Sequence, residues 1–523
     1  TLQGGDSGGI TNSGNFAHID ANLGTQLFTL GTVQLTGTIG GVDASTAIQA
    51  PHQNITVNGD VRFNGATGGS GSIGTRIGSL ADTPTDLTLT VHGNILLKGG
   101  STATNPPNGG VASIGINGNS TTQQVANIAI VADGNVTLTA GTNGSQARIG
   151  QAPTPPLGGG NISITAGAIT AGGKIALNAT PGNSATIRTL GNITLHADST
   201  GGSISEAADG IITAANLTAT ANAGISLLGG TNAISSFSAT NAASGNISLV
   251  NSVALAVAAG NVTNNATGGN ITLNNSGIVT ETGGIITTAT GGLELLGIGT
   301  YTLTNGTTND VGLLAAALTG TTTPLQYTDK NAVNISTVNS TVGINSNNNT
   351  VTINAGGTVG VLQNIAASNA AVNITTTGTT SNIDGGGGII SSTNATTGIT
   401  LNAGGGIGIG AVIKTDVTDP TTPGKLKLTT GGSLANGNIN LTEAGQLTFG
   451  NTTGNIDTTV AAGGGHSIVF TSTSGPFTVA ADAGACAGCL NNNQTLITGA
   501  GDILLKNTTA INSGTGIVRL VSA

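Results

Sequence analysis

Apolar and polar residues alternate most clearly at residues 87–101, and the same pattern returns 41 positions later, at residues 128–142. The apolar positions and one Gly-Asn pair coincide: Leu87 with Ile128, Leu89 with Ile130, Gly93-Asn94 with Gly134-Asn135, Ile95 with Val136, and Leu97 with Leu138. Apolar residues at every second position place one face of a strand inward. Each copy therefore predicts two short strands that meet at a Gly-Asn corner.

A strand of this length cannot bury its inner face alone, so it needs a neighbour with the same pattern stacked on it. The Gly-Asn pair suits a sharp corner with positive φ. An Ile-Gly step follows each copy after a gap of variable length, at Ile114-Gly115 and Ile149-Gly150, and Ile73-Gly74 follows residues 59–63 in the same way. These features predict an all-β fold, a parallel β-helix (β-solenoid) that forms one elongated rod with loops projecting from constant coils.

The regularity of the pattern changes along the chain. Residues 1–50 are the least regular and are expected to form an irregular first region, followed by a continuous β-solenoid with loop excursions over residues 51–523. Prolines within residues 105–110 and 151–160 place those segments outside the strands, because proline lacks a ladder donor. The denser apolar run at residues 311–318 is expected to form one short helical turn.

The composition favours a solenoid over a compact globule. The chain has 88 Gly, no Met, no Trp, 2 Tyr and 7 Phe among 523 residues, whereas a thick core normally uses aromatic side chains. Stacked Ile, Val, Leu and Ala fill a thin core without them. A hydrophobic fraction of 37% and a mean hydropathy of +0.21 argue against a disordered chain.

The charge balance narrows the range of partners. Twelve basic and 21 acidic residues give a net charge of −9, and the cations are scattered, so we expect no nucleic-acid binding. No apolar run approaches the roughly 18 residues of a membrane span, so we expect no membrane insertion. Neither a signal peptide nor an initiator Met is present, which indicates a processed or excised piece.

Three short motifs match active-site or ligand-binding patterns. Residues 5–9 (Gly-Asp-Ser-Gly-Gly) copy the nucleophile motif of chymotrypsin-like proteases, but the general-base His should lie well upstream of Ser7. Residues 69–74 fit the dinucleotide fingerprint without a following helix. Asp384 precedes a glycine run instead of ending one, unlike calcium repeats. Chance matches in a glycine-rich chain explain all three, so we expect no catalytic, cofactor or metal site.

A polysaccharide-cleaving β-helix is the main enzymatic alternative. Such a site needs two or more carboxylates that converge in a cleft. The closest acidic groups are Glu206 with Asp209 and Asp416 with Asp419, all in segments that resemble turns. We interpret each as a solvated loop charge and expect no enzymatic activity.

The two cysteines, Cys486 and Cys489, are separated by Ala and Gly. A redox motif would need a helix N-terminus within a βαβ unit, and a zinc site would need two more ligands. Neither context is present in the surrounding sequence. The favoured interpretation is a Cys486–Cys489 disulfide across a loop of an extracellular protein.

The recurring Gly-Asn-Ile-Thr-Leu units, together with residues 171–177 and 398–405, resemble the shafts of filamentous-haemagglutinin-type exoproteins of the two-partner secretion route. The resemblance is one of repeat style and covers most of the chain. It implies a right-handed parallel β-helix outside the cell on a bacterial surface, acting in adhesion, biofilm or matrix structure. The Asn-Pro-Asn-Leu motif of that family's secretion domain is absent.

The expected function is therefore that of an extracellular structural or adhesive protein of a bacterial surface fibre, filament or biofilm matrix. Its expected partners are further copies of itself and glycans of host or neighbouring cell surfaces. Residues 516–521 form another alternating strand without a polar cap, which predicts head-to-tail filaments by strand addition unless the ends are cut sites of a longer chain. The alternative function is a polysaccharide-binding or polysaccharide-cleaving β-helix of the tailspike kind.

Overall fold

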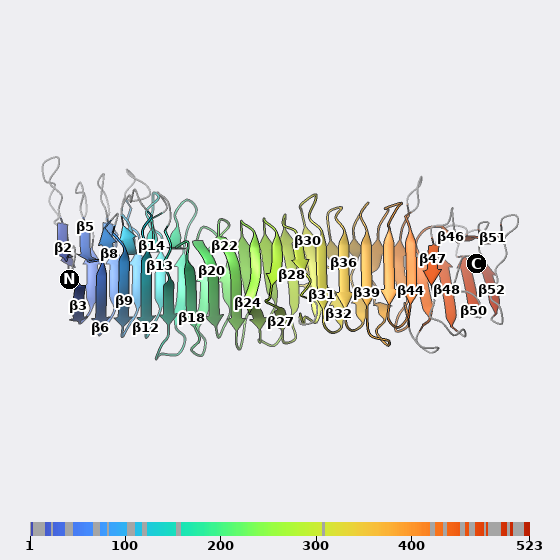
Figure 1. The fold of residues 1–523 in the computed structure, drawn as a ribbon, viewed down its shortest axis with the longest axis horizontal. Helices are drawn as coiled ribbons and strands as arrows, with labels where there is room; N and C mark the ends of the chain where they lie inside the picture. Colours follow the sequence, from blue (N-terminus) through green and yellow to red (C-terminus); the bar gives the residue numbers. More distant parts are fainter. Residues whose placement is uncertain are drawn as a thin grey trace. The chain divides into compact units, whose positions relative to one another are not determined.

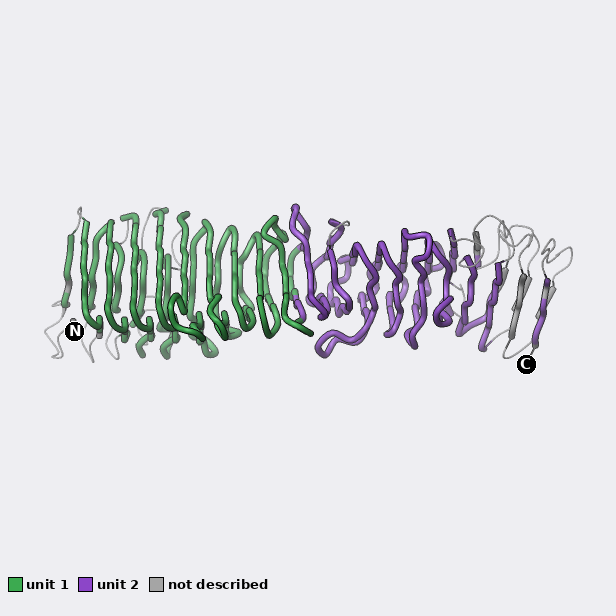
Figure 2. The backbone as a smooth tube through the Cα atoms, turned by 90° about the horizontal axis from the view of Figure 1, so that it is seen from below, with its two compact units in different colours: residues 1–269, 273–277 green, residues 270–272, 278–523 purple. Residues whose placement is uncertain are grey.

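The chain folds into β-strands joined by turns, and none of the described residues lies in a helix. The computed structural model describes residues 2–3, 16–21, 25–36, 45–65, 74–80, 83–101, 110–117, 123–152, 158–305, 309–418, 424–431, 437–449, 456–459, 466–474, 477–479, 493–498, 503–505 and 517–522. It has two compact units (Figure 2). Unit 1 comprises residues 1–269 and 273–277, and unit 2 comprises residues 270–272 and 278–523.

Unit 1 is built from strands of two sheets, A and B, which alternate along the chain (Figure 1). Its sheet A strands are β1 (Leu2–Gln3), β4 (Val33–Thr36), β7 (Val61–Asn64), β10 (Ile95–Lys98), β13 (Val136–Thr139), β16 (Lys174–Asn178), β19 (Ser203–Glu206), β21 (Ile225–Leu227) and β23 (Ile247–Asn251). Its sheet B strands are β2 (Phe16–Asp20), β3 (Thr25–Leu30), β5 (Ser45–Gln49), β6 (His52–Val57), β8 (Gly74–Leu80), β9 (Thr85–Val91), β11 (Ala112–Asn117), β12 (Ala126–Ala132), β14 (Ala147–Gly150), β15 (Ile162–Ala166), β17 (Ala185–Arg188), β18 (Asn192–Ala197), β20 (Ile211–Ala221), β22 (Ala233–Asn241) and β24 (Leu255–Asn264).

Unit 2 repeats this arrangement, and β25 (Ile271–Asn275) has residues in both units. Its sheet A strands are β28 (Gly292–Gly297), β30 (Leu313–Leu318), β32 (Val333–Ile335), β35 (Ile344–Asn345), β37 (Val359–Val361), β38 (Ile365–Ala366), β40 (Ile383–Gly385), β41 (Ile389–Ser391), β43 (Ile413–Asp416), β45 (Ile439–Glu443), β48 (Ser467–Ser472), β50 (Asn493–Thr498) and β52 (Val518–Ser522). Its sheet B strands are β26 (Val279–Thr282), β27 (Ile286–Thr288), β29 (Tyr301–Leu303), β31 (Leu325–Asp329), β36 (Val351–Ala355), β39 (Val372–Thr376), β42 (Ile399–Ala403), β44 (Leu426–Thr430), β46 (Leu447–Phe449), β47 (Ile456–Thr459), β49 (Phe477–Val479) and β51 (Ile503–Leu505).

Successive coils of each unit pair through parallel strands, so the predicted all-β parallel β-helix is confirmed. The first strands of unit 1 follow the same rule, since β1 pairs with β4 and β2 pairs with β5, both in parallel. The two copies of the repeat pair in the predicted register, and all the paired side chains are buried: Leu87 with Ile128, Leu89 with Ile130, Ile95 with Val136, and Leu97 with Leu138.

The Gly-Asn corner works differently from the sequence prediction. Gly93 and Gly134 do not adopt positive φ. A Cβ on Gly134 would lie 2.4 Å from Oδ1 of Asn94, and one on Gly93 would lie 2.6 Å from Oδ1 of Asp60. Glycine is therefore required at this corner because the neighbouring coil approaches closely, and the prediction of a positive-φ corner is wrong.

Asparagine at the corner links successive coils. Oδ1 of Asp60 accepts a hydrogen bond from the backbone N–H of Asn94 at 2.8 Å, and Oδ1 of Asn94 accepts one from Asn135 at 2.9 Å. Oδ1 of Asn135 in turn accepts from the backbone N–H of Lys174 at 2.9 Å. Each side chain thus satisfies a backbone donor of the next coil, which explains why Asn recurs at this position.

The Ile-Gly step before the Leu87 copy lies four residues later than the sequence suggested. Ile77 and Gly78 of β8 pair with Ile114 and Gly115 of β11. Ile73 lies outside the described residues, and Gly74 opens β8. The gap between coils has variable length, so spacing alone could not choose between the two Ile-Gly pairs.

The helical turn predicted at residues 311–318 is wrong. This segment contains β30, which pairs with β28 in register over its whole length. Ala315 and Ala316 point to opposite faces of the strand, and both are buried. A strand buried on both faces has a continuous apolar sequence, which periodicity alone does not distinguish from a helix.

An antiparallel hairpin lies against β30 in unit 2. It consists of β33 (Thr337–Val338) and β34 (Thr341–Val342). Val338 is 1% exposed, and a Cβ on Gly292 of β28 would lie 2.5 Å from its Cγ2 atom. The hairpin therefore covers the outer side of β28 and β30 at this point.

Candidate functional site

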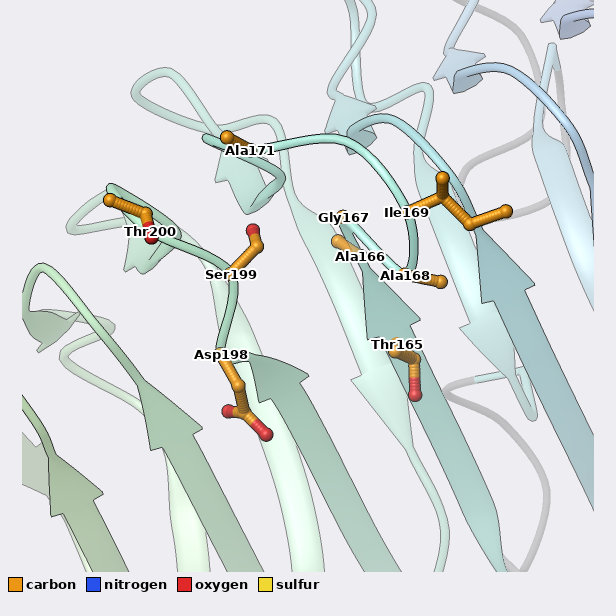
Figure 3. A pocket seen from close by; sticks show the side chains of 9 residues that line it. All are labelled: Thr165, Ala166, Gly167, Ala168, Ile169, Ala171, Asp198, Ser199 and Thr200. Atoms are coloured by element: carbon orange, nitrogen blue, oxygen red, sulfur yellow. The ribbon is translucent and has the colours of Figure 1, made fainter.

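A surface pocket of about 510 Å³ opens in unit 1 beside the ends of two neighbouring sheet B strands (Figure 3). One wall is the loop of residues 167–173, which joins β15 to β16, and the other is the turn of residues 198–200, which follows β18. The lining residues are Thr165, Ala166, Gly167, Ala168, Ile169, Ala171, Asp198, Ser199 and Thr200.

Strand register brings the two walls together. β15 and β18 pair in parallel, and Thr165 lies beside His196. Both strands end within two residues of this pair, so the segments that follow leave the sheet side by side. The first segment is longer than the second, and a hollow forms where the two diverge.

The longer loop is held by the preceding coil. The backbone N–H groups of Gly167 and Ala168 donate to the carbonyl oxygens of Gly134 and Ala132, at 2.9 Å and 3.1 Å. The backbone N–H and the hydroxyl of Thr170 both donate to the carbonyl oxygen of Asp133. These contacts anchor the loop to the preceding coil.

The same loop is also tied to the turn on the other side of the pocket. The backbone N–H of Gly172 donates to the carbonyl oxygen of Thr200 at 2.8 Å, and that of Gly173 donates to Oγ of Ser199 at 3.3 Å. Gly167 has a φ of +71°, and a Cβ there would lie 2.4 Å from Oγ of Ser199. Glycine at this position therefore allows both the turn of the loop and the approach of Ser199.

Asp198 is the one ionisable residue among the described residues that line the pocket. Its Oδ2 atom lies 3.4 Å from Nδ1 of His196, and the two side chains are 56% and 36% exposed. Figure 3 shows the Asp198 and Thr165 side chains on the sheet side of the pocket, and the Ser199 side chain extending from the turn toward the 167–173 loop. Ile169 extends from the far side of the loop and is 78% exposed.

This arrangement suits recognition by hydrogen bonding. The carboxylate accepts hydrogen bonds, and the hydroxyls of Thr165, Ser199 and Thr200 both donate and accept them. Hydrolysis of a glycosidic bond by the usual mechanism uses a pair of carboxyl groups, and one carboxylate lines this pocket among the described residues. The groups that line the pocket are suited to binding a ligand.

The structure separates the acidic groups predicted from the sequence. Glu206 is 2% exposed and lies inside the coil, whereas Asp209 in the following turn is exposed. The interpretation of Glu206 as a solvated loop charge is therefore wrong. Asp416 is half-buried at the end of β43, and Asp419 lies outside the described residues. Oδ1 of Asp384 accepts a hydrogen bond from the backbone N–H of Gly410 at 2.9 Å.

Several predicted sites fall outside the part of the chain that the structure describes. These are residues 5–9, residues 69–73 of the dinucleotide-like motif, Cys486 and Cys489. Within the described ranges, no group of three or more His, Cys, Asp and Glu side chains is arranged to hold a metal ion. Those ranges also contain no apolar helix of membrane-spanning length.

Sequence reasoning missed the pocket residues Asp198 and Ser199 and the neighbouring His196. Their one signal was the His-Ala-Asp-Ser sequence at residues 196–199, in a chain that has five histidines. This segment lies beside residues 165–171 because β15 and β18 pair in register, and the sequence pattern does not specify that pairing. Comparisons with protein-family models, with curated proteins and with solved structures find no match to this chain.

Proposed function

We propose that this chain is a structural and adhesive β-solenoid outside a bacterial cell, in a surface fibre, filament or biofilm matrix. The observation that carries the proposal is the repetition of one coil geometry with in-register apolar columns. In unit 1, Ile48, Ile77, Ile114, Ile149 and Ile187 form one such column. A core of this kind can be extended by adding coils. It therefore suits a structural protein that exposes a large surface for contacts.

The outer faces support the same proposal. Residues between the buried positions are mainly Thr, Ser and Asn, as in β9, β15 and β18, and charged residues make up 6% of the chain. Such a surface has hydroxyl and amide groups at regular intervals and a low density of charged side chains. It favours hydrogen-bonded contact with neutral surfaces over electrostatic capture of nucleic acid.

Self-association is part of the proposal. Successive coils are joined by backbone hydrogen bonds between parallel strands, as between β48 and β50 and between β50 and β52. This ladder uses backbone groups that every residue except proline carries, so a strand of a second copy can continue it. Head-to-tail addition of this kind gives an open filament instead of a closed ring.

The resemblance of the repeat units to filamentous-haemagglutinin-type shafts favours the extracellular and bacterial setting. The alternative, a polysaccharide-binding β-helix, is favoured by the pocket beside Asp198. The two proposals are compatible, because a matrix protein can bind the polysaccharide around it.

Immunogold electron microscopy of the producing cells tests the location and the assembly. Antibodies against this chain should label fibres or matrix outside the cell, and the purified chain should form filaments that lengthen with protein concentration. Labelling confined to the cell interior contradicts the extracellular proposal. A purified chain that stays monomeric at all concentrations contradicts self-association.

A further inference from the structure

The Asp198 pocket has a lining that matches one neutral sugar unit. We infer that it binds a neutral saccharide of a surface or matrix polysaccharide, with Asp198 as the central acceptor and Ser199 and Thr165 as further hydrogen-bonding groups. The inference rests on the proposed function, because it names the chemistry of the adhesive partner.

The size of the pocket is suitable for such a ligand. Its volume of about 510 Å³ lies within the range of about 300–1,000 Å³ that is common for small-ligand sites. The pocket is open to solvent, since Asp198 and Ile169 in its lining are both exposed, so a sugar unit within a longer chain can enter without the chain having to end there.

The polar groups complement the hydroxyls of a sugar. The Asp198 carboxylate has two oxygens, and it can accept hydrogen bonds from two neighbouring hydroxyls of one ring. Oγ of Ser199 accepts from the backbone N–H of Gly173, and its own O–H remains a donor for the ligand. Thr165 can supply a donor or an acceptor on the sheet side of the pocket.

The charge distribution selects against anions. The one ionisable group lining the pocket among the described residues is a carboxylate, and it would repel phosphate, sulfate or uronic acid groups. Nδ1 of His196, which is outside the lining, lies 3.4 Å from Oδ2 of Asp198.

The apolar groups complement the C–H face of a sugar ring. The methyl groups of Ala168 and Ala171 line the pocket beside the polar groups. Small side chains leave room for a ring, and a mixed lining of this kind fixes the orientation of a ligand that has both polar and apolar edges.

The pocket is formed before any ligand binds. Hydrogen bonds anchor the 167–173 loop to Ala132, Asp133 and Gly134 of the preceding coil, and to Ser199 and Thr200 of the next. The loop therefore loses little conformational freedom when a ligand binds, which favours a measurable affinity even though the contact area is small.

Saturation-transfer NMR on the full chain tests the inference, with methyl glycosides of glucose, galactose, mannose and N-acetylglucosamine as probes. At least one glycoside should give a saturable signal with a Kd in the millimolar range, which is common for single sugar units of small contact area. Asp198→Ala should weaken that binding tenfold or more. Asp209→Ala, which removes another exposed carboxylate of unit 1, should leave it unchanged.

Two further probes separate the alternatives. Methyl phosphate should give no saturable signal, and methylammonium should give none that depends on Asp198. The inference fails if no glycoside saturates, if Asp198→Ala binds as well as the unaltered chain, or if methylammonium is the Asp198-dependent ligand. Filament formation by the same variants, followed by electron microscopy, tests the proposed function separately, because Asp198 is exposed and outside the apolar columns.

Discussion

Leu177 and Glu206 are paired in register on the neighbouring strands β16 and β19, so a carboxylic acid occupies a column that leucines fill on either side. The next residues of the column are Leu227 and Leu249. Oε2 of Glu206 accepts hydrogen bonds from the side-chain amide of Asn232 at 2.7 Å and from the backbone N–H of Gly229 at 3.0 Å. Its buried Oε1 atom has no hydrogen-bond partner among the described residues.

Burial raises the pKa of Glu206 from 4.5 to about 7, and the two hydrogen bonds offset part of that effect. A folded-state pKa above the unfolded value means that the folded chain holds the proton more tightly. The contribution of Glu206 to the free energy of unfolding is fully present below pH 4.5, falls as the pH rises, and is lost above about pH 7. The full effect is about 3 kcal/mol.

We therefore predict that unfolding requires more urea at pH 5 than at pH 8. Glu206→Gln should reduce this difference, because the amide stays neutral at both pH values, and it should stabilise the chain at pH 8. Asp209→Asn in the following turn is the matched control and should change neither midpoint. Equal pH dependence in the unaltered chain and in Glu206→Gln would contradict the prediction. Burial also raises the pKa of Glu281, Asp329 and Glu443, so part of the pH dependence should remain in Glu206→Gln.

A second prediction concerns the stacked apolar columns. Leu97 is fully buried and lies between Phe63 and Leu138 of the adjacent coils. Leu97→Ala should lower the free energy of unfolding by about 2–5 kcal/mol, because it leaves a cavity in a core that relaxes only partly. Leu96→Ala is the control, since Leu96 points outward from the same strand and is half-buried. Urea titration of both variants measures the difference, and equal losses would contradict the assigned faces.

The register of this part of the fold followed from the sequence because the signal is local and repeated. Leu87 to Leu97 and Ile128 to Leu138 carry the same alternation at one spacing, and side-chain alternation along a strand leaves little choice of which residues face inward. Stacking then follows, because each coil buries its inner face against an equal neighbour.

Features that depend on a neighbouring coil were not accessible in the same way. Gly93 is required because Asp60 of another coil approaches its corner closely. The apolar run around Ala315 is buried on its outer side because the hairpin that contains Val338 packs against it. The pocket forms between residues 167–173 and Asp198, which belong to different coils. Loop lengths vary between coils, so the sequence does not state which segments become neighbours.

A third prediction concerns the β33–β34 hairpin. Oε1 of Glu294 accepts a hydrogen bond from Oγ1 of Thr341 at 2.7 Å, and Oε2 accepts from Nδ2 of Asn339 at 2.6 Å and from Oγ1 of Thr272 at 2.7 Å. Glu294 is therefore the acceptor that fastens the hairpin to β28. Hydrogen bonds to a charged group contribute about 1.5–3 kcal/mol each.

Glu294→Ala should release this hairpin while the coil beneath it stays folded. Amide hydrogen exchange of residues 337–342 should become at least tenfold faster, with exchange in β36 and β39 unchanged. Thr352→Ala, which alters an outward residue of β36, serves as the control and should leave the hairpin protected. Unchanged exchange of the hairpin in Glu294→Ala would contradict the prediction and would show that the packing of Val338 and the hydrogen bonds of Asn339 with Asn270 and Thr272 are sufficient to hold it in place.

A fourth prediction is the disulfide between Cys486 and Cys489, which lie outside the described residues. The isolated protein should resist alkylation until it is reduced, after which both cysteines should react. Mass spectrometry of the peptide that contains residues 486–489 gives the result directly. Free thiols in the isolated protein, or a bond to a second chain, would refute the intramolecular disulfide.

The fifth prediction compares a buried and an exposed asparagine that both link neighbouring coils. Oδ1 of Asn251 accepts from the backbone N–H of Ile234 at 2.9 Å, and its amide donates to the carbonyl oxygens of Ile234 and Val253 and to Oδ1 of Asn275. Asn251 is 1% exposed. Asn192 lies on the surface, where its amide donates to Asn161 at 3.0 Å and its Oδ1 accepts from Asn216 at 2.7 Å.

Asn251→Ala should cost several times more stability than Asn192→Ala. Loss of Asn251 leaves the backbone N–H and carbonyl groups of the buried Ile234 without these partners, at about 1–3 kcal/mol for each unsatisfied group, whereas water replaces the partners of an exposed side chain. The exposed substitution should cost about 1 kcal/mol or less. Urea titrations of the two variants measure the ratio directly. Similar losses for both would contradict the prediction. They would mean that water reaches the corner beside Asn251 and can replace the hydrogen bonds of its amide.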